Sequence, residues 1–245
     1  MRPDGRRPDE LREITFERDF TDSAHGSILA TFGKTRVLCT AMVDTGVPRW
    51  IKGSGKGWVT AEYSMLPGAS PERIGRERKG PKGRTHEIER LIGRSLRSAV
   101  DMTILGECQV LVDCDVLQAD GGTRTASICG AWLALHDALS RFVADGRIAA
   151  MPIVDELAAI SVGIIEGEPR LDLPYVEDSV AEVDMNVVMT GSGKLIEVQG
   201  TAEGQAFTRG ELDELLDLAT GGINEIVALQ REMVATPPPG RPLGR

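Results

Sequence analysis

The sequence predicts an α+β fold in which mixed sheets are packed against helices, and two observations carry this prediction. Within residues 13–64, four segments have the pattern of β-strands before any segment with a helical period appears. The second part of the chain repeats the order of strands first and helices afterwards. This order suggests a two-fold structural repeat, although no repeated sequence accompanies it. With 245 residues, 41% of them hydrophobic and 27% charged, the chain is long enough for a sizeable core.

The first 64 residues predict strands. We expect four of them, at residues 13–20, 25–32, 35–43 and 58–64. In the first, apolar and polar side chains alternate, which is typical of a strand with one buried face. The second and third are joined around Gly33 and Lys34, a sequence typical of a hairpin turn.

The middle of the chain predicts a loop followed by two helices with a strand between them. Residues 67–84 are rich in Pro, Gly and Arg, so we expect a long surface loop. Apolar residues at helical spacing predict a helix from 86 to 102, with Thr85 as its N-cap. A buried strand at 107–116 then leads through a glycine turn into a helix of small residues at 124–142.

The rest of the chain predicts three strands and two helices. We expect the strands near 157–165, 180–189 and 194–200, and the helices at 209–218 and 221–234. Thr208 and Glu211 have the spacing of a capping box. The tail, residues 236–245, is rich in Pro and Gly and is expected to be disordered, which leaves one folded domain at residues 1–235.

Composition excludes several classes of protein. The four cysteines form no Cys-x-x-Cys pair and lie among apolar neighbours, so we expect reduced thiols in the core rather than zinc ligands or disulfides. No apolar run approaches the ~20 residues that span a bilayer, and the start of the chain lacks an apolar signal segment. We therefore expect a soluble, cytoplasmic protein with no membrane partner.

Basic residues are concentrated in one segment, although the net charge of the chain is −9. Residues 72–97 contain nine Lys and Arg side chains but only four Glu. An anionic ligand would be sought here. A solvated helix face beside an ordinary loop would explain the same charges.

Two glycine- and arginine-containing motifs at helix starts predict a phosphate site. In Gly121-Gly122-Thr123-Arg124, the glycines let the backbone approach an anion, and the free N–H groups of a helix start favour phosphate. Arg124 adds a planar group that can bind two phosphate oxygens. Arg84, at the start of the preceding helix, could converge on the same anion. The structural alternatives are a tight turn and an exposed arginine near a helix cap.

An acidic strand predicts a site for a hard cation. Glu182, Asp184 and Asn186 fall on one face of the strand because side chains alternate along a strand, and Asp178 lies just before it. Such oxygen ligands can hold Mg²⁺ together with water. A half-exposed strand with acidic outer residues is the alternative. Combined with the phosphate motifs, the acidic residues indicate chemistry on a phosphodiester in which inorganic phosphate takes part.

Four segments together resemble the ribonuclease PH family. They are Arg-Pro-Asp-Gly-Arg at residues 2–6 and the stretches 83–97, 113–127 and 177–190, in this order and spacing. The resemblance extends from about residue 2 to 234, and it implies the fold of that family. It implies that phosphate is bound by Arg84, Gly122, Thr123 and Arg124. It also implies that the catalytic aspartates, which are associated with Mg²⁺, are Asp178 and Asp184.

The resemblance further implies a substrate and an assembly. The arginine-rich loop that guides an RNA 3′ end in this family matches Arg73, Arg76 and Arg78, with Glu72 and Glu77 interleaved here. The implied reaction is phosphorolysis. Inorganic phosphate attacks the terminal phosphodiester of a transfer RNA precursor or another structured RNA, a nucleoside diphosphate leaves, and the reverse addition also occurs. Family members form hexameric rings, trimers of dimers, so a homohexamer is implied.

Three other functions share some of these features. A non-catalytic RNA-binding ring subunit of the exosome type would share the fold, but this chain has both phosphate arginines and both aspartates. A metal-dependent hydrolytic nuclease would release monophosphates without needing phosphate. A polynucleotide phosphorylase would carry more than one such core and appended RNA-binding modules. The products formed with and without phosphate distinguish phosphorolysis from the first two.

Overall fold

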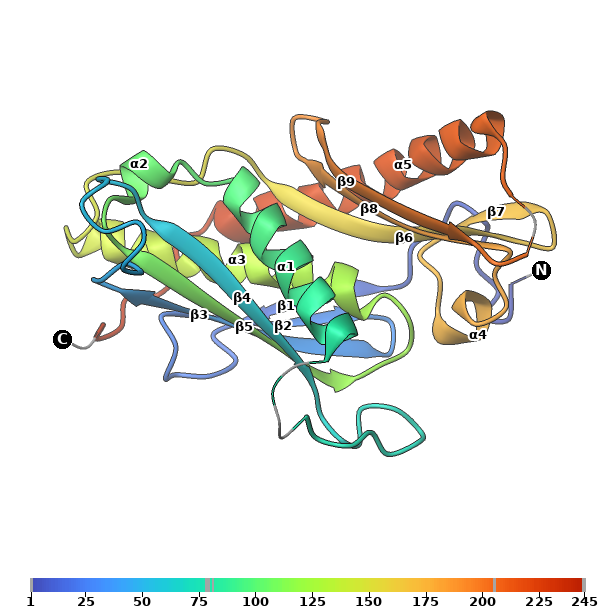
Figure 1. Cartoon of the computed structure of the whole chain (residues 1–245), viewed down its shortest axis with the longest axis horizontal. Helices are drawn as coiled ribbons and strands as arrows, with labels where there is room; N and C mark the ends of the chain where they lie inside the picture. Colours follow the sequence, from blue (N-terminus) through green and yellow to red (C-terminus); the bar gives the residue numbers. More distant parts are fainter. Residues whose placement is uncertain (1, 78–79, 81, 205, 244–245) are drawn as a thin grey trace.

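The fold consists of two β-sheets with helices between and beside them (Figure 1). The computed structural model describes residues 2–77, 80, 82–204 and 206–243. The first sheet has the strand order β1-β2-β3-β5-β4 and the second the order β7-β6-β8-β9. These sheets and helices confirm the predicted α+β class.

The first sheet is built from the N-terminal half of the chain. Its strands are β1 (Ile14–Arg18), β2 (Gly26–Phe32), β3 (Thr35–Asp44), β4 (Trp58–Met65) and β5 (Gln109–Gln118). Neighbouring strands are antiparallel except β4 and β5, which run parallel. A parallel pair needs a crossover, and the chain between β4 and β5 provides one through helices α1 (Gly83–Ser98) and α2 (Met102–Leu105).

The second sheet comes from the C-terminal half and is antiparallel throughout. Its strands are β6 (Leu157–Ile165), β7 (Glu168–Leu171), β8 (Val183–Thr190) and β9 (Leu195–Ala202). Every residue of β6 is buried, because helices pack on this strand while β7 and β8 flank it. The strand β7 and the one-turn helix α4 (Tyr175–Asp178) were not predicted, since four residues are too few to display a period.

Helix α3 (Thr123–Ala144) forms the centre of the molecule. It packs against β2 and β3 of the first sheet and against β6 of the second, so it lies between the two sheets (Figure 1). This position explains the abundance of small side chains in the predicted helix 124–142, because they let both sheets pack closely on it. Helix α5 (Arg209–Val234) packs along β6 and β7.

Two helix boundaries differ from the predictions. Helix α1 begins at Gly83 with Lys82 as its N-cap, so Thr85 lies inside the helix rather than capping it. The Glu77 carboxylate explains the earlier start, because it accepts hydrogen bonds from the Lys82 N–H at 2.9 Å and the Thr85 hydroxyl at 3.1 Å. The helix also ends at Ser98, earlier than expected, and α2 follows as a separate turn.

Helix α5 is a single helix, whereas two were expected on either side of Thr220. A glycine pair interrupts the apolar period there, but Gly222 serves packing rather than a helix break. A Cβ atom on Gly222 would lie only 2.8 Å from the Leu171 side chain. The predicted capping box of Thr208 and Glu211 is confirmed at the start of this helix.

The cysteines lie in or beside the hydrophobic core. Cys39, Cys114 and Cys129 are buried, Cys108 is half-buried, and all four are free thiols, as predicted. No helix within the described parts of the chain is long and apolar enough to cross a membrane.

The C-terminal tail makes contacts where the structure describes it, whereas its composition predicted disorder. Arg241 donates hydrogen bonds to the carbonyl oxygens of Thr21 and Ala24. The side chain of Leu243 is buried, and its carbonyl oxygen lies 3.1 Å from Nε2 of His25. Because Nδ1 of His25 accepts the N–H of Val43 at 2.9 Å, Nε2 carries the proton and donates to Leu243.

Candidate active site

A glycine turn joins β5 to α3 and exposes the start of that helix. Gly121 and Gly122 both have positive φ, at 75° and 65°. A Cβ atom on Gly121 would lie 2.4 Å from the carbonyl oxygen of Leu173, so only glycine fits this turn. No side chain among the described residues caps the helix at Gly122. The first N–H groups of α3 are therefore available to an anion.

Hydrogen bonds from the N-terminal half of the chain hold the glycine turn in place, and a carboxylate of the second half fixes one of the donors. The hydroxyl of Thr35 donates to the Gly121 carbonyl at 2.7 Å and accepts the Asp120 N–H at 2.9 Å. Nη1 of Arg12 donates to the Asp120 carbonyl at 2.6 Å. Arg12 is itself fixed by Asp172, a fully buried carboxylate that accepts two hydrogen bonds from its guanidinium group. The turn is thus pre-organised rather than free to collapse.

Thr123 is the first residue of α3 and meets the first sheet through its side chain. Its hydroxyl lies 2.8 Å from the Tyr63 hydroxyl, and Tyr63 is a buried residue of β4. Burial raises the pKa of Tyr63, so its phenol stays protonated at neutral pH. This contact orients the Thr123 side chain at the helix start.

Arg124 extends from the first turn of α3 to the second sheet. Its Nη1 donates to Oε1 of Gln199 on β9 at 2.9 Å, and Nε2 of Gln199 donates to the Glu87 carboxylate of α1 at 2.6 Å. Glu87 lies 3.9 Å from Arg124. The guanidinium group is therefore held between α1 and β9, with donors left for a ligand.

The two predicted catalytic aspartates lie close together. Asp178 ends α4, and Asp184 is the second residue of β8. Burial raises the pKa of Asp178 above its usual value. Burial, and then the negative charge of Asp178, raise the pKa of Asp184 to about 6. Two partly buried carboxylates with raised pKa values, one of them raised further by the charge of the other, are characteristic of functional sites.

Positive charge opposes these shifts and comes from both predicted phosphate arginines. After burial, which raises the pKa of each aspartate, the charges of Arg124 and Arg84 lower it in both cases. Arg84 is an exposed residue in the first turn of α1. The structure thus brings two arginines from the N-terminal half and two aspartates from the C-terminal half to one place.

The carboxylates fit a hydrated divalent cation. Oδ1 of Asp184 is buried and has no hydrogen-bond partner in the described structure, which is costly for a carboxylate oxygen. No cluster of three or more His, Cys, Asp or Glu side chains that could hold a metal occurs in the described residues. Two carboxylates without a full protein cage are the ligand set that Mg²⁺ accepts, since it keeps several waters and binds substrate phosphates.

The remaining acidic-strand residues have different environments. Asn186 is buried in β8, where it pairs with Ser161 of β6 and Gln199 of β9. Glu182 is exposed and lies just before the strand. Of the three residues expected on one face, Asp184 is thus the one whose carboxylate interacts with that of Asp178.

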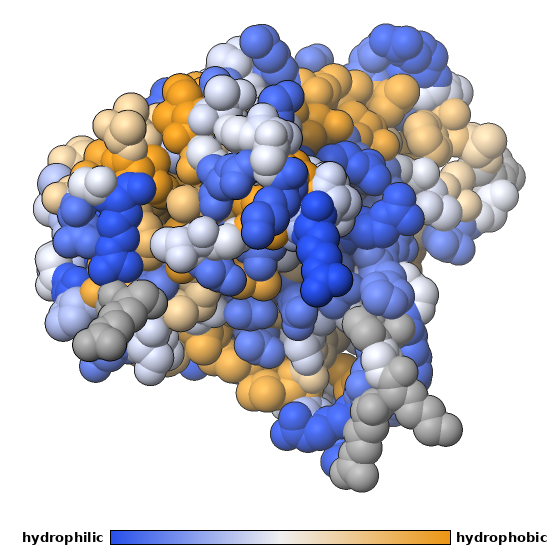
Figure 2. All heavy atoms as spheres, turned by 60° about the vertical axis from the view of Figure 1, so that its left-hand side comes forward, coloured by the Kyte–Doolittle hydropathy of each residue, from blue (hydrophilic) through white to orange (hydrophobic). Residues whose placement is uncertain are grey.

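The predicted RNA loop follows β4. Arg73 and Arg76 are exposed, as an RNA-binding role requires, while Arg78 lies outside the described residues. Glu77, which interrupts the basic run, is bound to the start of α1. Figure 2 shows one face of the molecule, on which hydrophilic side chains predominate and hydrophobic ones form patches between them.

Sequence reasoning missed four residues that organise the site. They are Arg12, Tyr63, Glu87 and Gln199. Arg12 and Gln199 had no detectable signal, because each lies in a stretch without a motif. Glu87 lies within the predicted helix 86–102 and Tyr63 within the predicted strand 58–64, and neither prediction pointed to the site.

Two family models match the chain. Domain 1 of the 3′ exoribonuclease family matches residues 10–140, and domain 2 of the same family matches residues 155–222. These two stretches contain the first and the second sheet. They also contain every predicted phosphate and aspartate residue.

Individual relatives agree with these models. The chain is 56% identical over 232 residues to ribonuclease PH of Synechococcus elongatus, covering 95% of this chain and 98% of the relative. Among solved structures, rice (Oryza sativa) Rrp46 has a TM-score of 0.76 at 20% identity, covering 95% of this chain and all of the rice chain. A chain of the Archaeoglobus fulgidus exosome with RNA bound to the active site also has a TM-score of 0.76, at 23% identity, covering 93% of this chain and 91% of the archaeal one. At these identities the two structures show the fold alone.

Proposed function

The chain belongs to the 3′ exoribonuclease family and is a phosphorolytic 3′→5′ exoribonuclease of the ribonuclease PH type, and on this premise we propose which residues carry out the reaction. Phosphorolysis needs a site for inorganic phosphate, compensation for the charge that develops at phosphorus, and contact with the RNA strand. One observation carries the assignment: the positive charges of Arg84 and Arg124 lower the pKa of the same two carboxylates, Asp178 and Asp184.

Inorganic phosphate occupies the start of α3 in this proposal. The uncapped N–H groups after Gly122 and the Thr123 hydroxyl supply hydrogen-bond donors. Arg124, held by Gln199, supplies a planar charged group, and Arg84 adds a second charge from α1. Charge-assisted hydrogen bonds of this kind are short and strong, and they orient the phosphate oxygens as well as binding them.

The reaction exchanges one phosphorus–oxygen bond for another. An oxygen of the bound phosphate forms a bond to the terminal phosphorus of the RNA, and the bond from that phosphorus to the 3′ oxygen of the preceding nucleotide breaks. The products are a nucleoside diphosphate and a shortened RNA, whose new 3′ oxygen takes up a proton. Asp178 assists this proton transfer, directly or through water. Because similar bonds form and break, nucleotide addition in reverse is also expected.

Asp178 and Asp184 would hold a divalent cation, which we propose to be Mg²⁺. The buried oxygen of Asp184 without a hydrogen-bond partner, and a pKa that stays raised despite Arg124 and Arg84, are what a cation-binding carboxylate would show. When bound, Mg²⁺ would offset negative charge on the pentavalent transition state. The residues themselves contribute a fixed pair of carboxylates at the edge of the phosphate site.

The RNA 3′ end approaches through the loop after β4. Arg73 and Arg76 are exposed there, and Arg78 belongs to the same basic run. We assign to them the phosphates of the RNA strand, with precursors of transfer RNA and other structured RNA as substrates. Single-stranded RNA held by such charges binds independently of sequence, which suits an enzyme that trims successive nucleotides.

We also propose a homohexamer, a trimer of dimers, and a cytoplasmic location; both follow from the family. One feature of the chain supports the assembly. Several large apolar side chains are exposed, and Val154, Val176, Val180 and Leu195 are each more than half exposed. Contacts with other copies would bury such side chains.

The products of RNA cleavage test the proposed function. A transfer RNA with a 3′ extension is incubated with and without inorganic phosphate, and the released nucleotides are separated by chromatography. We expect activity only with phosphate, and nucleoside diphosphates as products. Equal rates without phosphate, with monophosphate products, would show a hydrolytic nuclease instead. RNA binding without any nucleotide release would indicate a non-catalytic ring subunit.

A further inference from the structure

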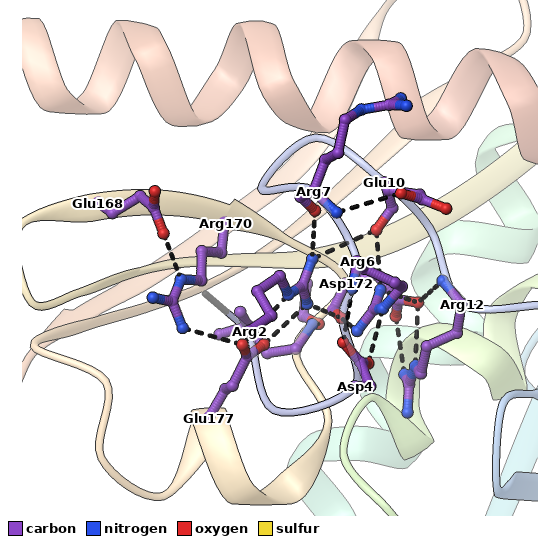
Figure 3. Close-up of polar contacts among 12 residues, drawn as sticks. Arg2, Asp4, Arg6, Arg7, Glu10, Arg12, Glu168, Arg170, Asp172 and Glu177 are labelled. Carbon is purple, nitrogen blue, oxygen red and sulfur yellow. Dashed lines mark hydrogen bonds and ion pairs between the residues drawn. The ribbon is translucent and has the colours of Figure 1, made fainter.

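The N-terminal segment, residues 2–12, lies against the second half of the chain and binds two carboxylates there (Figure 3). Arg2 is only 3% exposed, and its Nε and Nη2 donate to the Glu177 carboxylate at 3.1 and 2.7 Å. Arg170 of β7 donates to the same carboxylate at 2.9 Å. Glu177, 2% exposed, thus has two guanidinium partners from segments far apart in sequence.

The same segment holds a second buried carboxylate. Asp172 accepts the Arg12 guanidinium group at 2.9 and 2.7 Å and the Arg12 backbone N–H at 2.9 Å. Arg6 adds an ion pair at 3.6 Å. Through its Nη1, Arg12 also reaches the carbonyl oxygen of Asp120, next to the phosphate-binding glycines. Segment 2–12 therefore connects the glycine turn to the residues that precede Asp178.

Asp178 depends on these contacts for its position. It ends α4, a single turn of four residues, and a turn this short is not stable by itself. One side of the turn is anchored by Glu177, the neighbour of Asp178. The other side touches the glycine turn, where Oδ1 of Asp120 accepts the Tyr175 N–H at 3.4 Å. The turn is thus fixed between the N-terminal segment and the phosphate site.

We propose that Arg2, Glu177 and Arg170 form a positioning cluster that holds Asp178 against the phosphate site. Glu177 acts through its neighbour and touches neither phosphate nor RNA, so it is a positioning residue rather than a catalytic one. The inference rests on the proposed function, because it takes Asp178 to be a catalytic carboxylate. It assigns a role to the Arg-Pro-Asp-Gly-Arg segment that binding of phosphate, cation and RNA leaves without one.

Directional contacts suit this role better than an apolar anchor would. Two guanidinium groups approach Glu177 from different sides, so they restrict its rotation as well as its location. Catalysis is sensitive to small displacements, since a shift of about 1 Å at a reacting group can cost about two orders of magnitude in rate. Loss of the cluster should therefore lower the turnover more than the affinity for RNA.

The test is Glu177→Gln in the full-length protein, with Asp137→Asn as the matched control. Asp137 is likewise fully buried and likewise accepts two hydrogen bonds from an arginine, Arg18. It lies 14 residues beyond Thr123 on α3, about 20 Å along the helix. Both changes remove a buried charge, but only one of them touches the turn that carries Asp178. Turnover, the Michaelis constants and the melting temperature are measured for each, well below both melting temperatures.

We expect kcat of Glu177→Gln to fall by about tenfold or more with the Michaelis constant for RNA within about twofold, while Asp137→Asn keeps near-normal kcat. Equal kcat losses in both variants, or a normal kcat in Glu177→Gln, would overturn the proposal. Should Glu177→Gln fail to fold, Arg2→Lys is measured in the same way, because it keeps the charge and loses the two-point contact. Asp178→Asn distinguishes failure of the proposed function from failure of the cluster. Normal turnover in Asp178→Asn contradicts the catalytic role that the proposed function gives to Asp178. Lost turnover in Asp178→Asn together with normal turnover in Glu177→Gln contradicts only the positioning role of the cluster.

Discussion

Asp184 lies beside Asp178 with one buried carboxylate oxygen that lacks a hydrogen-bond partner, and burial together with the charge of Asp178 raises the pKa of Asp184 to about 6. A carboxylate in this state destabilises the folded chain when it is ionised. The arrangement is therefore unfavourable for stability alone. It is favourable for binding a cation, whose positive charge would offset the negative charges of the Asp178 and Asp184 carboxylates.

Asp184→Asn separates these two effects. The change keeps the shape of the side chain and removes its charge, so we expect turnover to fall by orders of magnitude. The free energy of unfolding at pH 7 should stay the same or rise, because the cost of a buried, unbalanced charge is removed. Turnover, RNA affinity and sedimentation are measured on one preparation. Near-normal turnover in an intact assembly would contradict the assignment of the cation to Asp184.

The pH dependence of stability follows from the same pKa. The pKa of Asp184 rises from 3.8 to about 6 on folding, so between these values the folded chain binds the proton more tightly than the unfolded one. The contribution of Asp184 to the free energy of unfolding should decrease as the pH rises from about 4 to about 7. Each unit of pKa shift corresponds to about 1.4 kcal/mol, which makes the total contribution at most about 3 kcal/mol. Urea unfolding without divalent ions, compared between the wild type and Asp184→Asn, measures this slope, and parallel curves would contradict the prediction.

Arg124→Ala should weaken phosphate binding specifically. A charge-assisted contact contributes roughly 1.5–3 kcal/mol, so the Michaelis constant for phosphate should rise by about one to two orders of magnitude. The constant for RNA should change much less. Gln199→Leu keeps the Arg124 residue but removes the amide oxygen to which its guanidinium group donates. This variant should show a smaller increase in the Michaelis constant for phosphate. An unchanged phosphate constant in Arg124→Ala would remove this residue from the site.

The basic loop after β4 should determine how RNA binding responds to salt. Each phosphate contact contributes about 0.7 to the slope of log affinity against log salt for a single strand. Replacing Arg73, Arg76 and Arg78 together with alanine should therefore make the slope shallower, by up to about 2. RNA affinity is measured over a series of salt concentrations. Identical slopes for the wild type and the variant would mean that the loop is only solvated.

Local sequence patterns predicted most of the elements, and the failures have physical causes. The strands of the first sheet and the capping box at Thr208 were confirmed, because side-chain alternation and helix capping are local properties. The start of α1 was misplaced because the Glu77 carboxylate, in the preceding loop, binds the N–H of the N-cap residue Lys82. The break expected in α5 is absent because Gly222 meets Leu171, a residue of the second sheet.

The sequence by itself determined the chemistry of the separate parts. It contained a glycine turn suited to phosphate, two arginines at helix starts, and an acidic strand, and the resemblance related these parts to one family. In the folded chain the charges of Arg84 and Arg124 act on Asp178 and Asp184, and no local pattern could indicate their distances from one another. Those distances depend on how the two sheets pack around α3.

Only the tertiary structure decided what supports the site. Gln199 reaches Arg124 because β9 lies beside β8, and Arg2 reaches Glu177 across 175 positions of the sequence. Contacts of this kind leave no periodic or spaced signal in a single sequence. They arise from the packing of distant segments, which buries the charged groups and thereby makes each one require a partner.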